Sequence, residues 1–341
     1  MKKISMVMMA ASLLVAAPLF AQEAEVVAEP VAEAAVTAEG TTEAVAQEVP
    51  AVTNEIPGLQ TMFSQVFVDA SFKEISIELL AEDFTLVTSG SDAITLEIKS
   101  NTKEFVPTVV QDGKSLKVTQ KNKKSKTPSR VCSVVLTLPQ NYPPAKFNLS
   151  LTDGKATLDT FAAGEVELSA GNGTITAKEV RADEEFELSV DAGKATLDTV
   201  VTKEAELSAG TGLVTVQGVR ADKKLSVSAG NGTVNVQQTE TKSLSASAKK
   251  GTLTLKNVST DEFAISADKG SAVVDLAKSF TKASSLNVST GSINLLVPAT
   301  AVLYDTVSVG KGHYKSEFPS DTTGPELKGK IGKGNVTVTK K

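Results

Sequence analysis

The chain has no tryptophan, one cysteine and one histidine, and aromatic residues make up 4% of its 341 residues. Because Cys132 has no cysteine partner in the chain, an internal disulfide is excluded, and packing and backbone pairing must stabilise the fold. His313 alone gives no independent support for a Ser/His/Asp or Cys/His pair, so we expect it in a surface turn. The scarcity of aromatics and the abundance of Thr, Ser, Val, Ala and Gly disfavour a helical bundle and favour short strands with tight corners.

The chain begins with the pattern of a secretory signal peptide. Lys2 and Lys3 precede an apolar run from Ile4 to Phe20, which corresponds to a charged segment followed by a hydrophobic segment and a cleavage site. We therefore expect residues 1–21 to be a signal peptide and the mature protein to be periplasmic, at the outer surface or secreted, without a transmembrane helix. Since Leu19 stands where Ala is favoured, an uncleaved N-terminal anchor is the alternative.

Residues 22–56 consist mostly of Ala, Val, Glu and Pro and carry eight Glu with no Lys or Arg. Such a segment buries too little apolar area to offset the entropy of ordering, so the sequence predicts a disordered acidic linker. The formal net charge is −5 for the whole chain, so the part from Pro57 onward is nearly neutral. A nearly neutral charge is typical neither of a strongly basic nucleic-acid-binding protein nor of a strongly acidic solvating protein.

The main signal is a repeat of glycines at intervals of 19 to 22 residues. We expect each of these glycines at a corner of the chain, because Gly accepts positive φ or close backbone approach without a steric penalty. They are Gly154, Gly173, Gly193, Gly212, Gly232, Gly251, Gly270, Gly291, Gly312 and Gly334.

Apolar residues alternate on both sides of each glycine. Around Gly212 they are Leu207, Ala209, Val214, Val216 and Val219. A spacing of two indicates a strand with every second side chain facing one interior. Because one such turn cannot bury its own apolar side, the turns must stack at about 4.8 Å. The sequence therefore predicts an all-β, single-chain β-solenoid (β-helix) with turns of about 19–21 residues, of either hand.

The solenoid is expected to fill residues 57–341, with regular turns over 145–341. A 39-residue duplication, in which residues 154–160 recur as 193–199, supports growth by copying pairs of turns. Residues 57–144 alternate less regularly, and corners near Asp92, Lys114 and Cys132 would keep the period. We expect this part to form an irregular N-terminal β cap, with a separate small β-sandwich as the alternative; residues 298–341 would cap the other end.

Several short motifs resemble a known family. Ser-Ala-Gly-Asn-Gly-Thr-Ile-Thr at 169–176 has echoes at 208–215 and 228–235, and the segments 134–139 and 332–338 add a strand and a closing turn. In these motifs the chain resembles the bacterial putative-adhesin family, a domain of unknown function in exported β-solenoid proteins. The resemblance implies an adhesin-like or envelope structural module and points to no catalytic residue.

Asp159, Asp198 and Asp275 each follow a corner glycine by five residues and would line one side of the rod. A β-helix enzyme acting on polysaccharide needs convergent carboxylates, so these residues define the alternative of a carbohydrate-active enzyme. Solvated corner carboxylates are the simpler explanation of these residues. Calcium bridging between turns lacks a dense ligand loop, and we expect no metal and no cofactor.

A basic run with Pro128 is expected to be a surface loop that could contact an anionic glycan, a lipid headgroup or a peptidoglycan-linked polymer. Its charged residues are Lys121, Lys123, Lys124, Lys126 and Arg130. No aromatic residues are interleaved with them, which disfavours a nucleic-acid partner. Cys132, in an alternating apolar strand, is expected to be a small buried hydrophobe.

The positions one and three residues after the corner glycines are rich in Thr and Asn and would face outward. Examples are Thr174, Thr176, Thr233, Asn235, Thr252, Thr254, Ser292 and Asn294. Such ladders suit an exposed β-face that could bind a repetitive polymer or ice, although Leu213 and Val273 interrupt them. The sequence thus predicts a non-enzymatic exported solenoid that binds a surface glycan, an envelope polymer or another protein. A carbohydrate-active enzyme and a periplasmic assembly scaffold are the alternatives, and the oligomeric state is left open.

Overall fold

The structure is a computed structural model that describes residues 58–68, 71–120 and 131–341. The predicted signal peptide, the acidic linker and the basic run at 121–130 lie outside the described residues. Among the described residues no helix is long and apolar enough to cross a membrane. The helical structure that these residues do contain is the 3₁₀ turn η1 (Lys103–Phe105).

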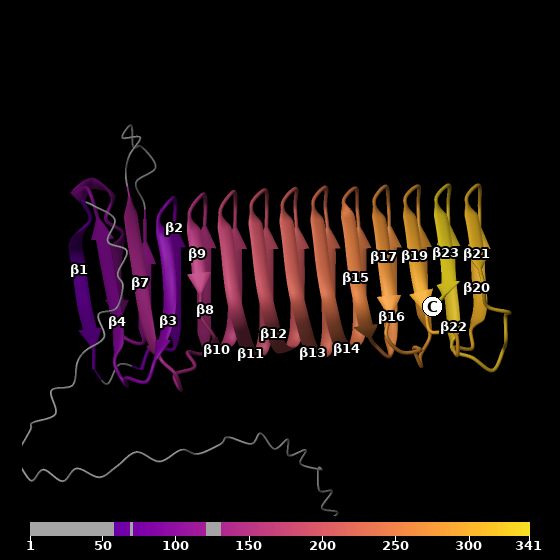
Figure 1. Cartoon of the computed structure of the whole chain (residues 1–341), viewed down its shortest axis with the longest axis horizontal. Coiled ribbons are helices and arrows are strands. Elements are labelled where there is room, and N and C mark those ends of the chain that lie inside the picture. Colours follow the sequence, from indigo (N-terminus) through magenta and orange to yellow (C-terminus); the bar gives the residue numbers. More distant parts are fainter. Residues whose placement is uncertain (1–57, 69–70, 121–130) are drawn as a thin grey trace, which may run out of the picture. The chain divides into compact units, whose positions relative to one another are not determined.

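The described part of the chain from residue 58 is all-β, and its strands form one hydrogen-bonded sheet that winds into stacked coils (Figure 1). The N-terminal strands are β1 (Gln60–Phe67), β2 (Glu74–Leu79), β3 (Asp83–Ser89), β4 (Ile94–Ser100), β5 (Thr108–Asp112), β6 (Ser115–Thr119) and β7 (Cys132–Pro139). The central strands are β8 (Lys146–Leu151), β9 (Lys155–Leu158), β10 (Phe161–Ala170), β11 (Thr174–Val190), β12 (Lys194–Ala209), β13 (Leu213–Ala229) and β14 (Thr233–Ala248). The C-terminal strands are β15 (Thr252–Ser259), β16 (Glu262–Ala267), β17 (Ser271–Leu276), β18 (Ser284–Val288), β19 (Ser292–Val297), β20 (Tyr304–Val309), β21 (His313–Ser316), β22 (Glu326–Ile331) and β23 (Asn335–Lys340).

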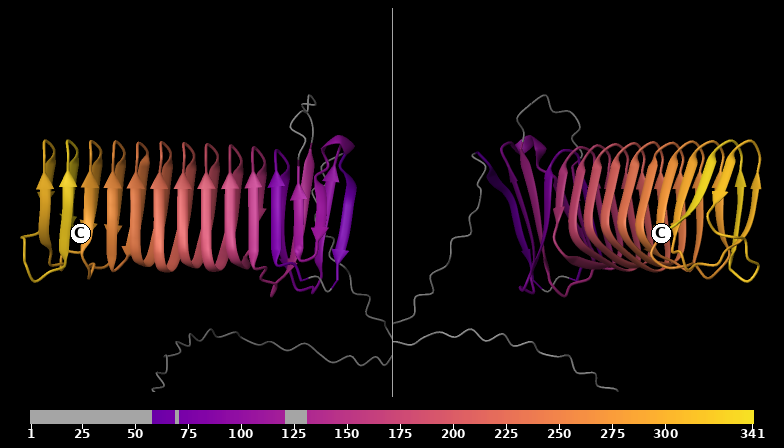
Figure 2. Two further views of the ribbon diagram at one scale, coloured as in Figure 1. Left: turned by 180° about the vertical axis from the view of Figure 1, so that it is seen from behind. Right: turned by 45° about the vertical axis from the view of Figure 1, so that its right-hand side comes forward.

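Each coil has two broad sides, and strands on one side pair in parallel with those of the neighbouring coils (Figure 2). The long strands β11 to β14 bend from one side to the other, so each of them supplies most of a coil. The predicted β-solenoid is therefore confirmed. Its repeat of about twenty residues is the length of chain needed to travel along both sides and return to the corner.

The interior is formed by rows of apolar side chains that run along the rod, one residue from each coil. Val214 pairs with Val234, and Val234 pairs with Leu253 in the next coil; none of the three is accessible to solvent. Because neighbouring inward side chains stack directly over one another, each coil buries its apolar residues against two others. A single coil could not do this alone.

The ten corner glycines form a ladder in which each glycine packs on the backbone of an adjacent coil. A Cβ atom on Gly173 would lie 2.6 Å from the carbonyl oxygen of Gly154, and the other corner glycines are equally crowded. Positive φ is not the reason for glycine here, since among the described glycines only Gly58 and Gly113 have it. Glycine is required because the corners approach one another too closely for any side chain.

At the C-terminal end the order of coils in space differs from the order in sequence. β22 lies between β18 and β20, and β23 lies between β19 and β21, so the last segment of the chain is inserted inside the stack (Figure 1). The inserted strands have apolar inward residues such as Leu327 and Val336, whereas the terminal coil directs Asp305 and Tyr314 inward. The more apolar coil therefore occupies the position with a neighbour on each side. Residues 298–341 form this end, as expected, and the corner at Gly334 lies between the corners at Gly291 and Gly312.

The N-terminal strands continue the same sheet and the same core. β2 and β3 pair with β8 and β9, while β4 is antiparallel to β7 and to β1, and β5 forms an antiparallel hairpin with β6. The described residues thus form an irregular cap on the solenoid rather than a separate β-sandwich. Antiparallel strands at this end replace the parallel register of the repeat.

The corners predicted in this region are only partly right. Asp92 and Lys114 do lie where the chain turns, but there it reverses into β4 and within the antiparallel β5–β6 hairpin. Cys132, the first residue of β7, is in register with Gly154, because Ser133 and Lys155 both pair with Asp83. A corner that was not predicted is Glu82, whose carbonyl group packs against Gly154. Its buried carboxylate accepts hydrogen bonds from the backbone N–H groups of Leu80 and Ala81, at 2.7 and 3.0 Å. A glutamate that closes its own turn is not recognisable in a search for glycines.

Candidate functional site

One broad side of the solenoid, formed by β8, β10, β16, β18, β22 and the second halves of β11 to β14, presents a continuous row of serines. Each serine pairs in register with the serine of the next coil. The members of this serine row are Ser150, Ser169, Ser189, Ser208, Ser228, Ser247 and Ser266. All are exposed or half-buried, and the Ser228 hydroxyl donates to the Ser208 hydroxyl at 3.1 Å. The row offers one hydroxyl per coil, at about 4.8 Å.

Beside the serine row, three neighbouring coils carry two rows of exposed glutamates. The inner row, next to the serines, consists of Glu167, Glu187 and Glu206, which are in register with one another. The outer row lies two residues earlier on each strand and consists of Glu165, Glu185 and Glu204. Partial burial, followed by the charges of Glu167, Glu206 and Glu185, raises the pKa of Glu187. Lys146 and Lys223 form ion pairs with the outer row, with Glu165 at 3.7 Å and Glu204 at 3.5 Å.

These glutamates were not among the residues predicted from the sequence. Their signal is the pattern Glu-x-Glu-Leu-Ser, which begins at Glu165, Glu185 and Glu204. Read along the chain, each copy is an ordinary alternating strand. Each copy begins eight residues before a corner glycine, Gly173, Gly193 or Gly212, so an alignment on these glycines places the six carboxylates on one surface.

Replacing Glu187 by glutamine is expected to raise stability at neutral pH and to reduce the stability gained on acidification. A carboxyl group whose pKa is higher in the folded than in the unfolded state destabilises the fold when it is ionised. This cost disappears as the pH falls through the folded-state pKa toward the unfolded value. The effect should be modest because the side chain is exposed.

The measurement is the difference in thermal midpoint between the two proteins at pH 7 and near pH 4.5. Glu262→Gln is the matched control, since its in-register neighbour on β14 is the uncharged Ser243. Equal behaviour of the two variants would show that repulsion within the glutamate rows is negligible.

The opposite side carries the predicted threonine ladder. The residues three positions after the corners pair in register from coil to coil and are exposed or half-buried. They are Thr157, Thr176, Thr196, Thr215, Asn235, Thr254, Val273, Asn294 and Thr337. Val273 interrupts this row, and Leu213 interrupts the adjacent row of Thr174 and Thr233, as the sequence indicates.

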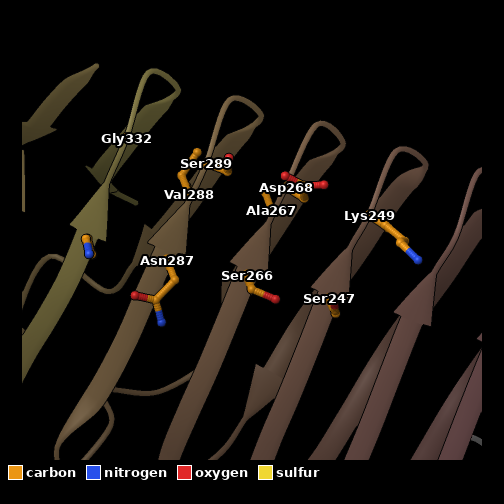
Figure 3. A pocket seen from close by; sticks show the side chains of 10 residues that line it. Ser247, Lys249, Ser266, Ala267, Asp268, Asn287, Val288, Ser289 and Gly332 are labelled. Carbon is orange, nitrogen blue, oxygen red and sulfur yellow. The ribbon is translucent and has the colours of Figure 1, made fainter. Parts of the chain in front are cut away.

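The broad side that carries the serine row, called the serine side below, contains a groove near its corner. This groove has a volume of about 630 Å³ and crosses four coils (Figure 3). Its floor continues the serine row from Ser247 and Ser266 to Asn287 and Lys330. Its other border, nearer the corner, consists of Lys249, Asp268, Ser289 and Gly332. The groove therefore combines hydroxyl, amide, ammonium and carboxylate groups on a rigid backbone.

The three aspartates that define the enzymatic alternative lie outside this groove. Asp159 forms an ion pair with Lys178 at 2.9 Å, which lowers the pKa of Asp159 through the hydrogen bond and the charge of the lysine. Asp275 forms an ion pair with Lys341, and Asp198 is exposed two coils away from Asp159. They are thus spread along an outer side of the rod, with two of the three carboxylates paired to lysines.

The remaining candidates occupy structural positions. His313 is the exposed first residue of β21, directly after a corner, and Cys132 is buried in β7. Within the described ranges no group of three or more His, Cys, Asp or Glu side chains is arranged to hold a metal ion. The candidate surface-contact residues Lys121, Lys123, Lys124, Lys126 and Arg130 fall outside those ranges.

Several solved structures resemble this chain along most of its length. A solved structure of a putative lipid binding protein from Parabacteroides distasonis has 14% identity and a TM-score of 0.51, covering 83% of this chain and 98% of the other. A putative adhesin from Parabacteroides merdae has 14% identity and a TM-score of 0.47, covering 83% and 97% of the two chains. A putative adhesin from Parabacteroides distasonis has 15% identity and a TM-score of 0.47, covering 82% and 96%.

At these identities only the likeness of the first structure is informative, and it concerns the fold alone. No curated protein matches the sequence of this chain significantly. Residues 72–224 match the family model described as Toastrack DUF4097, and this segment covers the N-terminal cap from β2 and the first regular coils. This match confirms the resemblance to the bacterial putative-adhesin family over residues 72–224, a segment that lies inside a longer β-solenoid.

Proposed function

We propose that this protein is an exported, non-enzymatic binding module of the cell envelope, adhesin-like in action, that holds a repetitive polymer along its serine side. The observation that carries the proposal is the serine row, which extends over seven neighbouring strands and leads into the groove. A polymer with repeating polar groups can contact several equivalent positions on such a surface at once. Weak single contacts then add up to useful affinity.

The rigidity of the rod supports this role. The outward residues are fixed by coil-to-coil hydrogen bonds and by a continuous core, so little order has to be gained when a ligand binds. The name of the lipid binding relative and the family resemblance both suit a binding module. For export, the support is the charged and apolar pattern of residues 1–21.

Catalysis receives less support than binding. Glycoside hydrolysis requires two carboxyl groups that flank one bond, whereas Asp159 and Asp275 are each engaged by a lysine on an open surface. We therefore expect the purified protein to release no products from uronate-containing polysaccharides. Turnover that is abolished by Asp198→Asn would instead favour the carbohydrate-active enzyme.

Two measurements test the proposed function. The first is cell fractionation with protease added to intact cells, and we expect the protein outside the cytoplasm. The second is co-sedimentation of the purified protein with isolated peptidoglycan and with extracellular polysaccharide. A cytoplasmic protein, or one that is retained by neither polymer, would contradict the proposal.

A second candidate, an assembly scaffold, is favoured by the exposed large hydrophobic residues. Those with high exposure in the described part of the chain all lie at the two ends of the solenoid: Val66, Val68, Val110, Val302 and Val309. The outer strands at these ends, β1, β5, β20 and β21, each have a partner on one side only. If copies associate end to end, light scattering will show particles whose size grows with concentration; a monomer at high concentration would exclude the scaffold.

A further inference from the structure

We propose that the groove bordered by Lys249 and Lys330 is a binding site for a linear acidic glycan, whose sugar chain lies along the axis of the rod. The proposal rests on the proposed function and specifies its ligand class.

The shape of the groove suits an extended chain. It is continuous over four coils, in the order β14, β16, β18 and β22, and one residue of each coil forms its floor. Figure 3 shows Ser247, Ser266 and Asn287 projecting in line from three neighbouring strands. Successive coils are separated by about 4.8 Å, so polar groups recur along the groove at a spacing comparable to that of units in an extended sugar chain.

The chemistry of the groove suits sugars that carry negative charge. Hydroxyl groups of Ser247 and Ser266 and the amide of Asn287 can both donate and accept hydrogen bonds, as sugar hydroxyls require. Lys249 and Lys330 are exposed, border the two ends of the groove and form no ion pair among the described residues. Two unpaired ammonium groups so placed favour carboxylate or phosphate groups on the ligand.

Asp268 is the single acidic residue of the groove and lies between the two lysines along the rod. A carboxylate at this position can accept hydrogen bonds from sugar hydroxyls, but it repels a second negative charge. We therefore infer a ligand whose charges are spaced apart, as in a chain with one acidic group per sugar unit, rather than a compact polyanion.

The rest of the serine side limits where such a ligand can bind. The glutamate rows occupy the same side on β10, β11 and β12 and would repel an acidic chain that continued in that direction. On β13 and β14, between them and the groove, Ser226 and Ser245 continue the inner row and Lys224 and Ser243 the outer row, so neither row has a carboxylate there. The acidic glycan site is thus confined to the C-terminal half of the rod.

The test is binding of the whole exported protein to a short oligogalacturonate, measured by isothermal titration calorimetry and compared with a neutral oligosaccharide of equal length. We expect binding of the acidic probe that weakens with added salt, because charge attraction is screened. The variant Lys249→Ala/Lys330→Ala should lose about tenfold or more in affinity. Lys249→Arg/Lys330→Arg should retain binding, because it keeps both charges.

The matched control is Lys194→Ala/Lys256→Ala, which removes two exposed lysines from the opposite side of the coils. We expect its affinity to equal that of the parent protein. Equal loss in both double variants, or equal binding of neutral and acidic probes, would overturn the acidic glycan site. If the protein co-sediments with envelope polymer and the groove lysines make no difference, this inference is overturned and the proposed function is still supported.

Discussion

Replacing Gly232 by alanine should destabilise the solenoid by about 2–4 kcal/mol, as expected when an extra methyl group is forced into a closely packed site. A Cβ atom at this position would lie 2.8 Å from the Thr211 carbonyl carbon and 2.9 Å from the Gly212 nitrogen, and closer still to the Gly212 oxygen. These are backbone atoms, and the N–H groups of Gly232 and Thr233 donate to the carbonyl groups of Gly210 and Gly212. The coils cannot separate without weakening that pairing.

The measurement is the free energy of unfolding from denaturant titration followed by circular dichroism. Gly218→Ala is the matched control, because a Cβ there meets its nearest neighbour, the Asp198 oxygen, at an ordinary 3.7 Å. That variant should be neutral or slightly more stable, since alanine restricts the unfolded chain. If both alanine variants unfold alike, the close approach of the corners is not what requires glycine.

An aspartate in place of Val234 should have an even larger effect, about 4 kcal/mol or more. Val234 is completely buried between Val214 and Leu253 in the central interior row, and an unpaired carboxylate there loses its hydration without gaining a partner. Because each coil is stabilised by its two neighbours, we expect the damage to spread along the rod.

Circular dichroism and limited proteolysis will show this as loss of β-structure and cleavage near β14. The control is Asn235→Asp, which introduces the same carboxylate one residue later, where the side chain faces outward in the threonine ladder. This variant should leave stability unchanged within about 0.5 kcal/mol. The loss in the Val234 variant should shrink at low pH, where the buried carboxyl group is protonated. A folded and protease-resistant Val234→Asp protein would contradict the inward assignment of this row.

The alternation around Gly212 and the other corner glycines was sufficient to predict the fold and the interior. Residues such as Leu207, Val214 and Leu253 are buried as the pattern indicates. The reason is that a strand has only two faces and a corner glycine fixes the phase between two strands. Local patterns of this kind can be read from one segment at a time.

The ends of the rod could not be predicted in the same way. The insertion of β22 and β23 beneath β20 and β21 depends on which coil has the more apolar inward side, and thus on a comparison of alternative stackings. The corner at Glu82 was missed because a glutamate side chain closes this turn, whereas the predicted corners were recognised by their glycines. In both places non-local packing decides the structure.

The sequence by itself determined the two-faced strands, the period of the coil and the separation of inward from outward residues, because these follow from backbone geometry and hydrophobic burial. Only the tertiary structure decided which coils are neighbours at the C-terminal end. There β22, and not β20, pairs with β18, so that Lys330 instead of Ser308 lies next to Asn287 in the groove. The reason is that the order of the coils depends on which stacking buries the more apolar inward residues, a comparison that no single segment of the sequence contains.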